Sequence, residues 1–123
     1  MMWPFTLFGK SRTMTFTAID ERFASTGQIR PDAVAELAAQ GYRAIICARP
    51  DHEDPGQPTF AEIAGEAKKH GMAAFHIPVS GRPTPAQQAS FDAAMAEAPG
   101  PVLGYCRSGG RAGSLYAGMA RKA

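Results

Sequence analysis

A short stretch near the C-terminus combines a thiol with groups that could bind an anion. Cys106 directly follows the apolar run 101–105. The residues after it are candidates for an anion-binding loop: Arg107, Ser108, Gly109, Gly110 and Arg111. Consecutive glycines let the backbone curl so that successive N–H groups converge, and a helix that starts there adds the positive end of its dipole. The stretch therefore predicts a cradle for an anion at a strand-to-helix turn.

Cys106 is the candidate nucleophile of this loop. A helix N-terminus and neighbouring arginines both favour the thiolate over the thiol. Arg111 could hold two oxygens of a bound anion with its planar guanidinium group, which makes it a candidate catalytic residue as well as a binding residue. A strand cysteine is more often a small buried apolar residue, and Cys47 in the run 44–48 fits that description. The succession of strand, cysteine, glycine turn, arginine and helix favours a catalytic role for Cys106.

A polar, proline-rich segment at 49–58 follows the carboxyl end of another predicted strand. Open α/β sheets bind ligands at that edge. Asp51, Glu53 and Asp54 could supply a general acid and His52 could move a proton, although solvated carboxylates are common in loops. These residues lack a recognisable metal-ligand spacing, so neither a metal site nor a cofactor is expected.

The rest of the chain alternates predicted strands and helices. Strands are expected at 15–19, 23–26, 42–48, 73–79 and 101–105. Helices are expected at 31–40, 59–70 and 84–98 and after residue 111. This order predicts a single α/β domain over residues 15–123, with a mostly parallel central sheet and helices on both faces. Residues 1–14 are expected to form an N-terminal arm or extension.

Composition limits the classes of protein that the chain can belong to. Its 123 residues, 45% of them hydrophobic, suit one small domain. A net charge of +2 without a basic run argues against nucleic-acid binding, and no segment approaches the roughly 20 apolar residues that span a membrane. Two distant cysteines favour a reducing, cytoplasmic location. The short final helix is expected to be compensated by homo-oligomerisation or by a removed C-terminal piece.

Several segments carry a resemblance to a known family: Gln28-Ile29, 45–51, Gln57-Pro58, 76–79 and 100–109. Together they resemble the phosphatase-like domain found in beta-lactamase hydrolase-like proteins, over about residues 15–120. The resemblance implies a fold similar to the dual-specificity (cysteine) protein phosphatases. It also implies a reaction at one active-site cysteine, described as sulfur transfer in some members and as phosphate hydrolysis in others.

The loop departs from the pattern of the resembled phosphatases. Those enzymes have five residues between cysteine and arginine, whereas four separate Cys106 from Arg111. Ala112 replaces a hydroxyl residue, Tyr105 replaces a histidine, and residues 80–82 lack the expected aspartate. A persulfide needs only a thiolate, a small cradle of N–H groups and an approach for a second thiol. We therefore expect a rhodanese-like sulfurtransferase that carries a persulfide on Cys106 and acts on a small anionic or thiol/persulfide substrate.

Two alternatives remain at this point. The first is a cysteine-dependent phosphatase that forms a phosphocysteine at Cys106, for which Asp51 is the nearest candidate acid. The second is a non-catalytic module that binds anions or phosphoproteins, since a fold can keep the shape of its site without its chemistry.

Overall fold

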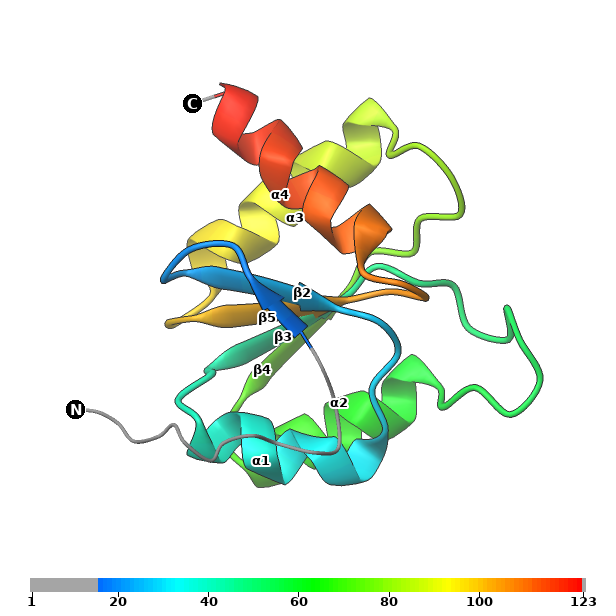
Figure 1. The fold of residues 1–123 in the computed structure, drawn as a ribbon, viewed down its shortest axis with the longest axis vertical. Coiled ribbons are helices and arrows are strands. Elements are labelled where there is room, and N and C mark those ends of the chain that lie inside the picture. Colours follow the sequence, from blue (N-terminus) through cyan, green and yellow to red (C-terminus); the bar gives the residue numbers. More distant parts are fainter. Residues whose placement is uncertain (1–15, 123) are drawn as a thin grey trace.

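The computed structural model describes residues 16–122, in which five strands form one sheet between two pairs of helices (Figure 1). The strands are β1 (Phe16–Ala18), β2 (Phe23–Thr26), β3 (Ala44–Cys47), β4 (Ala73–His76) and β5 (Val102–Tyr105). Their order in the sheet is β1-β2-β5-β3-β4. Only β1 is antiparallel to its neighbour, and every other pairing is parallel. The predicted single α/β domain with a mostly parallel sheet is confirmed. The expected arm over residues 1–14 lies outside the described residues.

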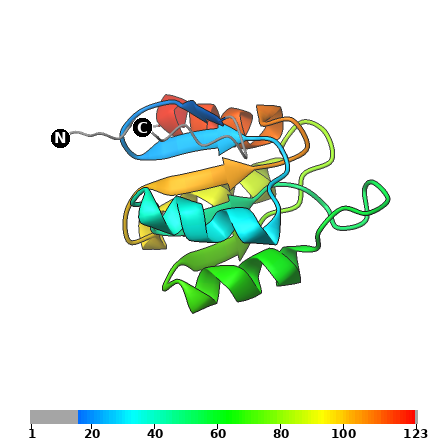
Figure 2. The ribbon, with the colours of Figure 1, turned by 60° about the horizontal axis from the view of Figure 1, so that its bottom comes forward.

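Helices cover both faces of the sheet. A 3₁₀ turn η2 (Pro31–Ala33) leads into α1 (Val34–Ala39), and α1 and α2 (Phe60–Lys69) lie on one face (Figures 1 and 2). The opposite face carries α3 (Pro85–Glu97) and α4 (Gly110–Lys122). Within the described residues, none of these helices has the length and apolar character needed to cross a membrane.

Two capping boxes fix where helices begin near the carboxyl edge of the sheet. Thr59 Oγ1 accepts the Glu62 N–H at 3.2 Å, and Glu62 Oε1 accepts the Thr59 N–H at 2.9 Å. Thr84 and Gln87 make the same reciprocal pair at the start of α3. Each box satisfies two N–H groups that a helix start leaves without partners. The loops that enter α2 and α3 therefore end at defined residues.

The sheet separates the hydrophobic core into two layers. Along β3, Ile46 packs in the layer with α3 and α4, whereas Ile45 and Cys47 pack in the layer with α1 and α2. This alternation follows from the two-residue repeat of a strand. At the end of β5 the same alternation puts Tyr105 in the α1/α2 layer and Cys106 in the α3/α4 layer.

Strand β5 lies in the centre of the sheet between β2 and β3. The Cys106 N–H donates to the Thr26 carbonyl at 3.2 Å, and the Ala48 N–H donates to the Tyr105 carbonyl at 2.8 Å. The chain that leaves β5 is therefore held by the ends of both neighbouring strands.

Candidate active site

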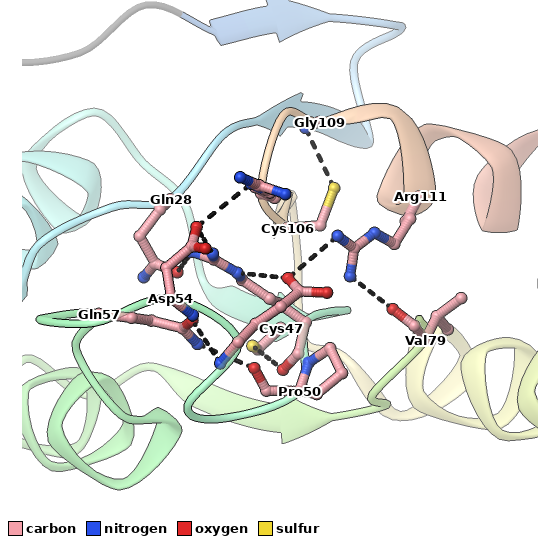
Figure 3. Close-up of polar contacts among 12 residues, drawn as sticks. Gln28, Cys47, Pro50, Asp54, Gln57, Val79, Cys106, Gly109 and Arg111 are labelled. Atoms are coloured by element: carbon pink, nitrogen blue, oxygen red, sulfur yellow. Dashed lines mark hydrogen bonds and ion pairs between the residues drawn. The ribbon is translucent and has the colours of Figure 1, made fainter. Parts of the chain in front are cut away.

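Cys106 lies between the end of β5 and the start of α4 and is fully buried. Its Sγ accepts a hydrogen bond from the Gly109 N–H at 3.0 Å (Figure 3). Gly109 has φ +98°, a conformation that residues with a Cβ rarely adopt. A Cβ there would make only ordinary van der Waals contact with Thr26, so the backbone conformation is what favours glycine. The glycine turn thus directs a backbone donor at the thiol.

Arg111 is the second residue of α4, and Figure 3 shows its guanidinium group beside Cys106. Its Nη1 donates to the Val79 carbonyl at 2.7 Å, and its Nη2 donates to Glu53 Oε1 at 3.0 Å. These two bonds fix the orientation of the group and use two of its five N–H donors. The four-residue spacing therefore still places the arginine next to the thiol.

Arg49 is a further charged residue at this edge, and sequence reasoning missed it. Its side chain is only 3% exposed. It donates to Glu53 at 2.8 Å, to Gln28 at 2.9 Å and to Asp54 at 2.6 Å. The sequence did contain a signal for this role, because Arg49 directly follows an apolar strand. A charged residue in that position is either exposed to solvent or paired with carboxylates. Arg49 joins the loop after β2 to the loop after β3.

Glu53 and Asp54 pair with Arg49 of their own loop and with Arg107 and Arg111 of the Cys106 loop. Glu53 lies between Arg111 and Arg49, and Asp54 lies between Arg49 and Arg107. The hydrogen bond from Arg111, followed by that from Arg49, holds the pKa of Glu53 below its usual value. Glu53 is therefore a carboxylate at neutral pH.

The same loop is also bound to itself through Gln57. Its Oε1 accepts the N–H groups of Glu53 and Asp54, each at 3.1 Å, and its Nε2 donates to the Pro50 carbonyl at 2.9 Å (Figure 3). These bonds hold the two carboxylates in place opposite the arginines.

Asp51 is bound to the start of α2. Its Oδ1 accepts the Phe60 N–H at 2.8 Å, at the start of α2. Its charge acts on Cys47 and Tyr105, which both belong to the α1/α2 layer. The structure describes no hydrogen bond or ion pair between Asp51 and the Cys106 loop. The assignment of Asp51 as a general acid stays a prediction.

The other predicted loop residues differ in exposure. The Arg107 side chain is 61% exposed, and its Nε lies 3.2 Å from Asp54 Oδ2. Ser108 is exposed, and Gly110 is the first residue of α4. Gly27, which sequence reasoning missed, supports the loop from β2, because a Cβ there would lie 2.9 Å from the Arg107 carbonyl oxygen.

Two neighbouring side chains are structural. The buried Cys47 thiol donates to the Arg49 carbonyl at 3.3 Å, and burial raises its pKa, so it is a neutral thiol at neutral pH. The His76 Nε2 lies 2.8 Å from the same carbonyl, and its ring stacks on Phe60 with centroids 4.7 Å apart. The expected buried, apolar character of Cys47 is confirmed.

A cation site is not evident in this region. Residues 16–122 contain no group of three or more His, Cys, Asp or Glu side chains that could hold a metal ion.

A thiol at the end of the central strand, a glycine turn that faces it and an arginine on the following helix define a cysteine-phosphatase-like α/β domain. The chain belongs to the phosphatase-like domain family of beta-lactamase hydrolase-like proteins, whose sequence model matches residues 15–121. The resemblance noted from the sequence is confirmed.

Known proteins support this placement. A beta-lactamase hydrolase-like protein from Agrobacterium fabrum is 43% identical over 104 residues, which make up 84% of this chain and 24% of that protein. The chain thus spans about a quarter of the length of that relative. A putative phosphatase from Neisseria meningitidis is similar with a TM-score of 0.74 and 31% identity, over 81% of this chain and 72% of the other. A putative phosphatase from Shewanella putrefaciens has a TM-score of 0.76 at 20% identity, over 88% and 71%.

These comparisons overturn the expected sulfurtransferase. The matching family is described as phosphatase-like, and the 31% identical structure is a putative phosphatase. The expectation was wrong because it treated the shorter loop and the replaced neighbours as losses of function. In the structure the shorter loop still brings Arg111 beside Cys106, and the Tyr105 side chain belongs to the opposite core layer.

Proposed function

We propose that this chain is a cysteine-dependent phosphatase. The Cys106 thiolate attacks the phosphorus of a bound phosphate monoester, and water then hydrolyses the phosphocysteine. The observation that carries the proposal is the hydrogen bond from the Gly109 N–H to Cys106 Sγ beside the guanidinium group of Arg111. The sulfur, a backbone donor and a cationic group are thus held together at a helix start, as nucleophilic attack on a phosphate monoester requires.

The surrounding groups suit a phosphoryl group better than an uncharged substrate. Backbone N–H groups at the start of α4 and the planar fork of Arg111 both favour an anion with several oxygens. Arg111 enters this role already oriented by Val79 and Glu53. Positioned charges of this kind stabilise the transition state of phosphoryl transfer without reorganisation.

The test compares Cys106→Ser with a matched control, Cys47→Ala, which removes the buried thiol on the other side of the sheet. With 4-nitrophenyl phosphate as substrate, Cys106→Ser is expected to lower kcat by at least about 1,000-fold. Cys47→Ala is expected to keep most of the activity if circular dichroism shows it to be folded. Rapid acid quenching should trap a phosphoryl group on the Cys106 peptide of the wild type.

Two results would contradict the proposal. Unchanged turnover in Cys106→Ser would remove the thiol from the mechanism. Binding of inorganic phosphate by the wild type, without turnover of the ester and without a phosphocysteine, would indicate the non-catalytic binding module instead.

A further inference from the structure

The carboxylates closest to the Cys106 loop are held by arginines rather than free to give up a proton. Glu53 Oε1 lies 3.0 Å from Arg111 Nη2 and 2.8 Å from Arg49 Nε. Both contacts favour its ionised form, and the pKa of Glu53 is lowered accordingly. A general acid must instead be protonated near the working pH. Glu53 can orient Arg111 but is a poor proton donor.

Asp54 is held in a similar way. Its Oδ2 lies 2.6 Å from Arg49 Nη2 and 3.2 Å from Arg107 Nε. Arg49, whose side chain is 3% exposed, has Asp54 and Glu53 as its two charge partners, and a buried charge of this kind needs its pairing. The structure therefore commits Asp54 to binding arginines.

The other polar groups at this edge belong to Asp51, to the loop after β4 and to His52. Asp51 accepts the Phe60 N–H at the start of α2, and the structure describes no hydrogen bond or ion pair between Asp51 and the Cys106 loop. The loop after β4 carries Ser80, Gly81 and Arg82, all exposed, so that it offers a hydroxyl and a positive charge near the edge where Arg111 binds Val79. His52 in the loop 49–58 is exposed and has φ 63°.

We propose that this site acts on phosphoric esters and anhydrides whose leaving group departs as a stable anion, without a proton from the protein. The inference rests on the phosphatase function proposed above and defines its class of substrate. Activated aryl phosphates, acyl phosphates and phosphoanhydrides belong to this class. Alkyl phosphates do not.

The first step forms the bond between Cys106 Sγ and phosphorus and breaks the bond between phosphorus and the leaving oxygen. The bonding electron pair leaves with that oxygen, which departs as a phenoxide, carboxylate or phosphate anion and needs no proton from the protein. In the second step a water oxygen bonds to phosphorus and the S–P bond breaks. The thiolate is restored, and the products are hydrogen phosphate and one proton.

The experiment measures kcat/KM for a series of phosphate monoesters that differ in the acidity of the leaving group. The series runs from 2,4-dinitrophenyl phosphate through 4-nitrophenyl phosphate to phenyl phosphate, and acetyl phosphate is compared with glycerol phosphate. Loss of general acid catalysis costs about 100-fold or more for a poor leaving group. We therefore expect kcat/KM to fall at least about 100-fold from the dinitrophenyl to the phenyl ester, and acetyl phosphate to be hydrolysed far faster than glycerol phosphate.

A similar kcat/KM across the series would overturn the proposal, because it would require a proton donor in the first step. In that case Asp51→Asn and His52→Gln would identify the donor, since removing it would restore the steep dependence. In the proposed mechanism both variants keep the steep dependence of the wild type. Failure of the phosphatase function itself would look different: even 2,4-dinitrophenyl phosphate would not be turned over, and Cys106 would carry no phosphoryl group.

Discussion

Glu53 Oε1 and Arg111 Nη2 lie 3.0 Å apart although 58 positions separate the two residues in the chain. The contact couples the stability of the loop 49–58 to pH. Arg111 and Arg49 lower the pKa of Glu53, so its contribution to stability is complete above the unfolded pKa of about 4.3. It is lost as the pH falls from there through the lower pKa of the folded state.

Glu53→Gln is therefore expected to lower the free energy of unfolding at pH 7 by about 1–3 kcal/mol. The difference from the wild type should shrink as the pH falls below about 4. Urea unfolding of both proteins at a series of pH values measures this difference in the free energy of unfolding. Glu66→Gln is the matched control, because Glu66 pairs only with the 70% exposed side chain of Lys69 and its loss should cost under about 1 kcal/mol. A difference between wild type and Glu53→Gln that does not change with pH would show that the ionised form of Glu53 is not favoured.

The two arginines of the loop are expected to contribute unequally to anion binding. Arg111→Lys should weaken inhibition by inorganic phosphate by about 10- to 100-fold, because an ammonium group cannot replace an oriented, bidentate guanidinium group. Arg107→Lys should change it by less than about fivefold, since the Arg107 side chain is 61% exposed. Inhibition constants measured against 4-nitrophenyl phosphate give both values. Equal losses would mean that Arg107 contacts the phosphate directly.

Gly27 is expected to be intolerant of a side chain. In Gly27→Ala the new Cβ would lie 2.9 Å from the Arg107 carbonyl oxygen, so the backbone of the Cys106 loop must shift. We expect a loss of about 1–3 kcal/mol in the free energy of unfolding, together with lower kcat.

Gly113→Ala is the matched control in α4. A Cβ at position 113 meets nothing within 4 Å, and replacing a helical glycine by alanine gains about 1 kcal/mol. Wild-type activity and stability in Gly27→Ala would show that the loop does not depend on its contact with β2.

Local sequence signals predicted much of the fold. The capping boxes at Thr59 and Thr84 involve residues three apart, so that a single segment contains both partners. The Cys106–Arg111 loop is also one continuous segment, so its glycine turn and its arginine could be predicted from the sequence. The start of the first helix was less regular than expected, because Pro31–Ala33 form a 3₁₀ turn before α1.

Contacts between distant segments could not be predicted in this way. Arg49 takes its partners from the loop after β2 and from its own loop, and their meeting depends on the parallel order of β2, β5 and β3. The acidity of Glu53 depends on Arg111 in the same manner. For this reason the sequence indicated several candidate general acids, whereas the structure shows that two of them, Glu53 and Asp54, form ion pairs with arginines.

The central position of β5 has a consequence for hydrogen exchange. The Cys106 amide is bonded to Thr26 on β2, and the adjacent Tyr105 carbonyl is bonded to Ala48 beyond β3. An amide in such a place exchanges only when the sheet itself opens, whereas the loop 49–58 is held mainly by side chains and can open at a lower free energy. The Cys106 amide is thus expected to exchange more slowly than the amides of the loop 49–58, so that the carboxylates of that loop can move while Cys106 stays in place.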